Sequence, residues 1–410
     1  MTEFQIAAIL VTLAAVFGLV NHHYLRLPTT IGLAAIALVA SLGVLAVDLL
    51  VPSVPIADTI REQVREIDFY RTVMEGMLGL LLFAGALDVD IEDLKANKGA
   101  IAVMASIGVV ISTLIVGFGF SWIAGVPIAV ALVFGALISP TDPVAVLGIL
   151  KTVKVPISLK TKIAGESLFN DGVGVVLFLI LAAVAFPETN GGEPMGVGAA
   201  SKLFLMEAVG GAVLGGVAGW LAYIAIRQVD EYTLEVTITL ALAMGAYALA
   251  GALHLSGPIA VVVAGLFIGN HGTSFGMSEK TQEHVRTFWH LIDEILNAVL
   301  FLLIGVEVVA LDLGVGLTTA LLAIPLVLFA RFISVGTTVT GLRIFRDFTP
   351  GAVPVMTWGG LRGGISVALV LSLPEGEWRP VLFAATYAVV VFSILVQGLT
   401  VRRAIKRFVG

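Results

Sequence analysis

The chain has 410 residues, of which 58% are hydrophobic and 13% are charged, and its mean hydropathy is +1.04. A soluble protein of this length carries about twice that charged fraction, so the composition excludes a soluble enzyme and a nucleic-acid-binding protein. The absence of cysteine excludes a disulfide framework and a thiolate metal site. The formal net charge of −6 says little about partners, because the distribution of charge along the chain matters more than the sum.

Apolar segments recur along the whole length, and each is long enough to cross a bilayer as a helix. The fold predicted is an all-α polytopic membrane protein with about 13 transmembrane helices. The charged stretch 52–70 is predicted to form a short helix on the outer surface. The predicted spans are 4–20, 30–50, 69–87, 99–123, 127–150, 160–186, 201–227, 232–252, 255–270, 283–309, 316–344, 350–373 and 379–401.

The loops alternate in basic content, and one set holds about three times as many Lys and Arg residues as the other. Basic residues gather in loops on the cytoplasmic side of a membrane. This rule places the C-terminus in the cytoplasm and the N-terminus outside, as an odd number of spans requires. We therefore expect a multi-pass protein of the plasma (inner) membrane.

The fifth predicted span is interrupted by the stretch Ser139-Pro140-Thr141-Asp142-Pro143. Two prolines cannot be accommodated in an unbroken helix, because each lacks an amide donor and deprives the carbonyl four residues earlier of its partner. The carbonyls of Ala136 and Ser139 are the two affected. Asp142 precedes a proline and is therefore pushed into an extended conformation. Broken backbone at this depth indicates a protein-lined or water-filled cavity, and we interpret the stretch as half of a cation site.

A second interruption lies in the twelfth span, where the stretch 358–365 contains four glycines and Arg362. Each glycine weakens a helix by about 1 kcal/mol. The two interrupted spans are seven apart in the chain. If spans one to six and eight to thirteen are two six-helix repeats, the breaks fall at corresponding positions in repeats of opposite topology. The sequence thus predicts inverted repeats with crossed discontinuous helices, the arrangement that marks a transporter site.

Among the charged side chains inside predicted spans, five lie well inside the fifth, sixth, eleventh and twelfth spans, and each would cost roughly 2.5–3.5 kcal/mol at the membrane centre. They must therefore face one another or water. Within the sixth span, Ser167, Asn170 and Asp171 share one helical face, whereas Glu166 points about 140° away from Asp171. We expect Asp171 to face the broken link and Glu166 to hold an arginine. The five charged residues are Asp142, Glu166, Asp171, Arg331 and Arg362.

Hard oxygen ligands without histidine or thiol favour an alkali cation over a transition metal. Two carboxylates in one site, Asp142 and Asp171, would take up a proton when the cation leaves and release it when the cation returns. Competition of Na⁺ and H⁺ for this pair is sufficient for exchange, with no cofactor. The partners expected are a monovalent cation, a proton and the lipid bilayer.

These residues resemble those of the NhaP-type sodium/proton antiporters, the prokaryotic relatives of the mammalian sodium/proton exchangers. The likeness extends over nearly the whole chain. It is carried by the motifs Ser139-Pro140-Thr141-Asp142-Pro143, Gly165-Glu166-Ser167, Phe169-Asn170-Asp171-Gly172, Phe301-Leu302-Leu303-Ile304-Gly305, Ala330-Arg331 and Gly359-Gly360-Leu361-Arg362-Gly363.

The resemblance implies a homodimer in which spans four to six and eleven to thirteen form a mobile ion-binding core. The core would then consist of residues 99–186 and 313–410, and the dimer or interface domain of residues 1–98 and 187–312. The resemblance also implies that Asn170, in place of a second aspartate, marks the electroneutral branch, which exchanges one cation for one proton.

The resemblance further implies how the site residues divide their work. The Na⁺ ligands would be Asp142, Asp171, Ser167 and the backbone of Thr141. Glu166 would pair with Arg331, and Arg362 would lie near the broken link. The candidates for cation and proton binding are Asp142, Asp171, Thr141, Ser167, Glu166 and Asn170.

Several alternatives stay open. Glu166 and Asp171 could belong to a structural polar network, and Arg362 could either shape the local field or only brace the broken span. The polar face of the tenth span, with His290, Asp293 and Asn297, could line a cytoplasmic funnel or contact another span.

The rival functions are a potassium/proton antiporter, a pH-gated cation channel and an organic-anion symporter. An enzyme is not expected, because no nucleophile–base pair or His-rich metal motif occurs.

Overall fold

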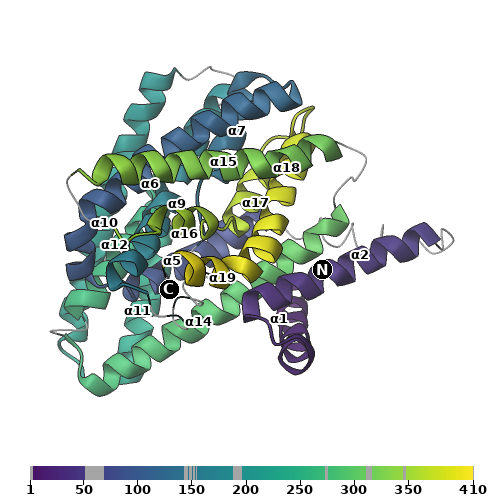
Figure 1. Cartoon of the computed structure of the whole chain (residues 1–410). Coiled ribbons are helices and arrows are strands. Elements are labelled where there is room, and N and C mark those ends of the chain that lie inside the picture. The colour runs from purple at the N-terminus through teal and green to yellow at the C-terminus, as the bar shows by residue number, and fades with distance from the viewer. Residues whose placement is uncertain are drawn as a thin grey trace.

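The computed structural model describes residues 3–50, 69–142, 155–187, 196–272, 276–310, 316–344 and 348–409, together with residues 146, 150 and 153. Within these residues the chain is almost entirely helical, and the sole β-type contact is an isolated bridge between Asp142 and Leu361 (Figure 1). The surface helix predicted for 52–70 falls almost wholly outside the described residues.

The N-terminal half contains the first six predicted spans. Short π-helical turns (η1, η2) continue or interrupt some of its helices. The elements are α1 (Glu3–Val20), η1 (Asn21–Leu25), α2 (Thr29–Leu50), α4 (Phe69–Arg71), η2 (Thr72–Met77), α5 (Leu78–Leu87), α6 (Ile91–Ala124), α7 (Ile128–Ile138) and α9 (Ile157–Ala185).

The C-terminal half contains the remaining seven predicted spans. Its elements are α10 (Val197–Ile226), α11 (Tyr232–Ala252), α12 (Gly257–Phe267), η4 (Ile268–Gly272), α14 (Glu279–Val306), η5 (Glu307–Ala310), α15 (Leu317–Leu342), α16 (Ala352–Trp358), α17 (Gly364–Leu371), α18 (Arg379–Phe392), η6 (Ser393–Gln397) and α19 (Gly398–Phe408).

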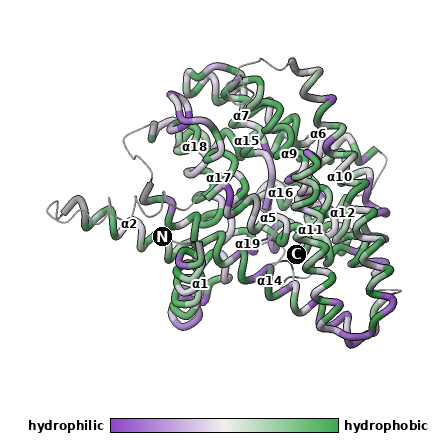
Figure 2. Tube along the Cα trace, turned by 180° about the vertical axis from the view of Figure 1, so that it is seen from behind, coloured by the Kyte–Doolittle hydropathy of each residue, from purple (hydrophilic) through white to green (hydrophobic). Residues whose placement is uncertain are grey.

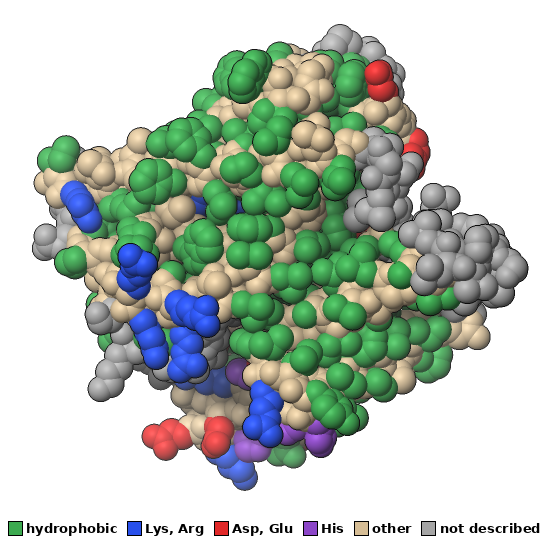
Figure 3. All heavy atoms as spheres, turned by 45° about the vertical axis from the view of Figure 1, so that its right-hand side comes forward, with side chains coloured by type: hydrophobic (Ala, Val, Ile, Leu, Met, Phe, Trp, Pro, Cys, Tyr) green, Lys and Arg blue, Asp and Glu red, His purple; other side chains and the backbone are tan. Residues whose placement is uncertain are grey.

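The predicted fold class is confirmed. Ten helical segments among the described residues are long and apolar enough to cross a membrane, and shorter apolar helices lie at 128–138 and 257–272. Hydrophobic side chains cover most of the face in Figure 3, whereas Lys and Arg gather along its lower left edge. Figure 2 shows the same contrast along the chain, with hydrophobic helices and hydrophilic residues concentrated at the lower end of α14 and around it. The chain is a multi-pass membrane protein.

Local sequence signals set the helix ends. The Asp90 carboxylate accepts hydrogen bonds from the amides of the first turn of α6, and Gly125 ends the same helix with a φ of +68°. Pro156 stands immediately before α9, where its missing amide costs no hydrogen bond. The Ser278 hydroxyl accepts from the Thr281 amide and begins α14.

The helices pack in two groups. In the first, α6 contacts α7, α9 and α15, while α15 also contacts α16 and α18. In the second, α12 contacts α5, α10 and α11, and α14 contacts α2, α5 and α11. Figure 1 shows α15 across the upper part of the molecule and α14 running obliquely along the lower part. The interrupted segment α16–α17 lies between them, which brings its break to the centre of the molecule.

Candidate cation site

The first interruption follows α7, which ends at Ile138. Residues 140–142 are not helical, and the Asp142 amide donates a 2.8 Å hydrogen bond to the Leu361 carbonyl of the other interruption. The predicted break and the extended backbone at Asp142 are therefore confirmed. Residues 143–145, which would begin the second half-helix, lie outside the described part of the chain. The two interruptions meet through a backbone hydrogen bond.

The second interruption lies between the end of α16 at Trp358 and the start of α17 at Gly364. Arg362, which is 2% exposed, extends from this break to the first one. Its Nη1 donates to the carbonyl oxygens of Ser139 at 2.5 Å and Pro140 at 2.8 Å. The expectation that the Ser139 carbonyl is bare is therefore wrong, because a guanidinium satisfies it. This carbonyl is accordingly engaged by Arg362.

Helix α9 presents one polar face to the first break, as its sequence predicts. The Asn170 side-chain amide donates to the Thr141 hydroxyl at 2.8 Å, and its oxygen accepts from the Thr141 amide at 3.3 Å. The Ser167 and Thr141 hydroxyls lie 3.0 Å apart. All three residues are buried. Asn170 therefore holds the broken link in place beside α9.

Glu166 points away from this face and lies beside Arg331 of α15. The Arg331 guanidinium donates to both Glu166 oxygens, at 2.5 and 2.9 Å, in a bidentate ion pair. Both residues are buried, and within the pair the charge of each residue compensates that of the other. The pair joins α9 to α15 and does not line the cavity described next.

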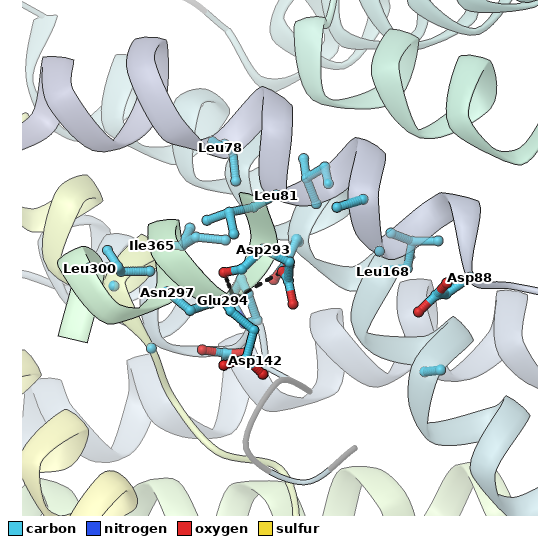
Figure 4. Close-up of a pocket in the computed structure, with 18 of the residues that line it drawn as sticks. Leu78, Leu81, Asp88, Asp142, Leu168, Asp293, Glu294, Asn297, Leu300 and Ile365 are labelled. Carbon is cyan, nitrogen blue, oxygen red and sulfur yellow. Dashed lines mark hydrogen bonds between the residues drawn. The ribbon is translucent and has the colours of Figure 1, made fainter. Parts of the chain in front are cut away.

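Asp142 and Asp171 line a single cavity of about 280 Å³. Asp171 comes from α9 and is 7% exposed, whereas Asp142 comes from the broken link and is half-buried. Figure 4 shows Asp142 just below Glu294 and Asn297 of α14, which also line this cavity. The structure therefore brings the two predicted carboxylates to one cavity, which Thr141 and Ser167 do not line.

Two glycines allow the close approaches that build this space. A Cβ on Gly363 would lie 2.6 Å from Asp142 Oδ2, and a Cβ on Gly174 would lie 2.2 Å from Pro140 Cγ. Neither glycine has a positive φ, so the constraint is steric. The glycines of the second break thus serve to admit the Asp142 carboxylate, in addition to weakening the helix.

The model of the family described as "Sodium/hydrogen exchanger, transmembrane" matches residues 10–407. The chain is also 45% identical to the Na⁺/H⁺ antiporter NhaP of Pseudomonas aeruginosa, an alignment that covers 98% of this chain and 96% of that protein. The chain belongs to the sodium/hydrogen exchanger family.

Other relatives agree with this assignment. This family member is 36% identical to the Na⁺/H⁺ antiporter NhaH of Halobacillus dabanensis, over 93% of this chain and 92% of that one. Its fold matches the sodium/proton antiporter MjNhaP1 of Methanocaldococcus jannaschii with a TM-score of 0.76, at 18% identity and over 99% and 98% of the two chains. The resemblance predicted from the sequence motifs is thereby confirmed, and the likeness to transporters indicates no catalytic activity.

One wall of the cavity in this family member comes from α14, whose neighbours the sequence left undecided. His290, Asp293, Glu294 and Asn297 all line the space, and Asn297 donates to Asp293 Oδ1 at 2.9 Å (Figure 4). The signal for this wall was the polar face of an otherwise apolar helix. Periodicity alone could not tell which neighbour that face meets.

The oxygen ligands of the site suit a cation that binds reversibly. Carboxylate and hydroxyl oxygens are ligands for hard cations. Within the described ranges, no group of three or more His, Cys, Asp or Glu residues is arranged to hold a metal ion. Several carboxylates line the cavity, among them Asp142 and Asp171, and the Thr141 and Ser167 hydroxyls lie close by; such oxygens suit a hard cation. The relatives named above are Na⁺/H⁺ antiporters, for which such ions are substrates, and no resident cofactor is implied.

Proposed function

We propose that this family member is a secondary active antiporter that exchanges one Na⁺ or Li⁺ for one proton. Asp142 and Asp171 bind either the cation or the proton, and the cavity opens alternately to the two sides of the membrane. The observation that carries this proposal is that both carboxylates line one cavity at the meeting point of two interrupted helices. The relatives named above are Na⁺/H⁺ antiporters, which supports the choice of ions.

Charge balance explains why exchange is obligatory. Two carboxylates on one cavity repel each other and are stable there only when a positive charge, either a cation or a proton, is bound between or on them. The Thr141 and Ser167 oxygens add ligands for the dehydrated cation. Asn170 positions Thr141 and carries no charge of its own, which fits an exchange of one cation for one proton.

The remaining charges serve the scaffold of the site. Arg362 donates hydrogen bonds to the carbonyls of the first break and contributes positive charge near Asp171. The ion pair of Glu166 with Arg331 ties α9 to α15, and neither residue contacts the transported ion in this mechanism. Glu166 is therefore assigned to the structural part of the predicted set.

We also propose which parts move. Residues 99–186 and 313–410 form the mobile core, and residues 1–98 and 187–312 form the interface domain of a homodimer. The packing of α6 against α7, α9 and α15, separate from that of α12 against α5, α10 and α11, supports this division. The protein lies in the plasma membrane, with its N-terminus outside and its C-terminus in the cytoplasm.

The experiment is Na⁺-driven proton movement in proteoliposomes. Asp171→Asn and Asp142→Asn are expected to abolish it while the purified protein keeps its thermal midpoint, and Glu92→Gln on the exposed start of α6 serves as a charge-removal control. Exchange at the wild-type rate from either aspartate variant would remove that residue from the mechanism.

The same liposomes test the rival functions. Comparison of Li⁺, Na⁺ and K⁺ identifies the cation, and a membrane-potential clamp tests the stoichiometry. A one-for-one antiporter gives proton movement that the clamp does not change. Current without proton counterflow would identify a channel instead.

A further inference from the structure

Glu235 is a buried carboxylate that the proposed transport mechanism does not use. It lies in the first turn of α11, and its residue is 0% exposed. Among the described residues, neither of its carboxylate oxygens has a hydrogen-bond partner, in contrast to Glu166, which receives two hydrogen bonds from Arg331. A buried carboxylate without donors is unstable as an anion, so its charge must be compensated.

The described residues around Glu235 supply no compensating cation. Helices α5 and α12, which pack against α11, contain no titratable residue. The first two turns of α14 carry both signs of charge, and Arg227 at the end of α10 lies over the Tyr223 ring. No ion pair joins any of these groups to Glu235 in the described part of the chain. The titratable residues of those two turns are Glu279, Lys280, Glu283 and His284, with Asp230 and Glu231 preceding α11.

A chain of hydroxyl groups connects Glu235 to the exposed loop between α10 and α11. Thr281 lies beside the Glu235 carboxylate, but its hydroxyl donates to the Ser278 carbonyl at 3.0 Å. The Ser278 hydroxyl lies 3.2 Å from that of Thr281 and donates to Asp230 at 2.9 Å. Asp230 is exposed. Hydroxyl groups therefore lead from the exposed Asp230 to Thr281, which lies beside Glu235.

The contact between α11 and α14 continues from Glu235 to the cavity. One turn beyond Glu235, the Thr239 hydroxyl accepts a 2.9 Å hydrogen bond from the Trp289 indole. Trp289 lines the cavity that holds Asp142 and Asp171. Its ring packs against that of Phe83, with 4.6 Å between the ring centroids. One continuous helix, α14, thus connects the contact at Glu235 to the cavity wall.

We propose that Glu235 is a proton-binding site distinct from the transport carboxylates, and that its proton holds α14 against α11 and so sets the wall of the cation cavity. Loss of the proton leaves a buried anion. The energetic cost of burying this charge falls when the first turns of α14 move away and admit water. The regulatory part of this proposal rests on the proposed antiport, whereas proton binding at Glu235 does not.

The pH dependence of thermal stability tests proton binding without any transport assay. Glu235→Gln is a neutral isostere of the protonated acid, and Glu231→Gln is a matched control at an exposed glutamate four residues earlier. Thermal midpoints of the purified full chain are measured from mildly acidic to mildly alkaline pH. The midpoint of Glu235→Gln relative to wild type is expected to rise as the pH rises, and that of the control to stay constant. A Glu235→Gln midpoint below wild type at every pH would show an ionised carboxylate and overturn the proposal.

Glu235→Leu is the second variant, for the case that Gln is not tolerated. A leucine of similar size fits a site that is neutral, so it should also gain stability relative to wild type towards alkaline pH. In proteoliposomes, both variants are expected to retain Na⁺-driven proton movement with a pH profile shifted from that of wild type. Unshifted profiles overturn the regulatory role. Absence of Na⁺-driven proton movement in wild type would instead refute the proposed antiport and leave the stability result standing.

Discussion

The amide of Asp142 donates a hydrogen bond to the carbonyl of Leu361 across 2.8 Å, and this contact joins two interrupted helices that are far apart in the chain. It holds a carboxylate-bearing residue in an extended conformation in the protein interior. Such backbone is stable there only because each break supplies the partners that the other lacks. The geometry of the cavity therefore depends on both breaks at once, and the following outcomes are expected.

Breaking the buried ion pair should destabilise the protein more than removing it. Arg331→Gln leaves the Glu166 anion unpaired, and Glu166→Gln leaves the Arg331 cation unpaired, each at a cost of about 3–5 kcal/mol. The double variant removes both charges and should recover most of the lost stability. Thermal midpoints of the three purified variants measure this. Additive losses in the double variant would contradict the pairing.

Removing the Arg362 guanidinium should destabilise the first break. In Arg362→Met the carbonyls of Ser139 and Pro140 lose their donor, and each buried unpaired acceptor costs about 1–3 kcal/mol. The thermal midpoint should fall clearly, and Arg286→Met, at an exposed position, should leave it unchanged. Equal midpoints for the two variants would show that the carbonyls find other partners.

Adding one methyl group at the second break should impair transport. In Gly363→Ala the new Cβ would lie 2.6 Å from Asp142 Oδ2, so the carboxylate must shift. Displacement of a binding group by about 1 Å costs up to 100-fold in comparable sites, and we expect a loss of at least about tenfold in exchange rate. Gly376→Ala, whose Cβ would meet nothing within 4 Å, is the control. Wild-type exchange by Gly363→Ala would mean that Asp142 need not keep this position.

Removing the negative charge of Asp293 should weaken cation binding without stopping exchange. Asp293 faces the same cavity as Asp142 and contributes negative charge to it. Across a water-filled space this is worth roughly 1 kcal/mol, so Asp293→Asn should raise the apparent KM for Na⁺ about 3- to 10-fold. Glu283→Gln, at an exposed position on the same helix, should leave the apparent KM for Na⁺ unchanged. A maximal rate lowered at unchanged KM would instead assign Asp293 to the conformational change.

Single cysteines can test the proposed orientation, because the natural chain has none. His290→Cys, exposed and on the cavity wall, should react with a membrane-impermeant thiol reagent added on the cytoplasmic side. Thr318→Cys, exposed at the start of α15, should react with reagent added outside. The opposite labelling pattern in sealed vesicles would reverse the topology.

Much of the fold followed from local chemistry. Span length and apolarity predicted the helices, because lipid requires each crossing segment to satisfy its own backbone. Two prolines around Thr141 and a glycine cluster around Arg362 predicted the breaks. The spacing of Ser167, Asn170 and Asp171 predicted the polar face of α9, since helical periodicity alone brings these residues together.

The sequence by itself therefore determined the membrane-spanning helices, the two interruptions and the face on which Asp171 lies, because these depend on neighbours within one or two turns. Only the tertiary structure decided that Arg362 donates hydrogen bonds to the carbonyls of the first break and that α14 forms a wall of the cavity. Arg362 and Ser139 are 223 positions apart, and no local pattern specifies which buried donor reaches which free acceptor. That pairing is selected by the packing of the whole bundle, where each buried polar group must find a partner.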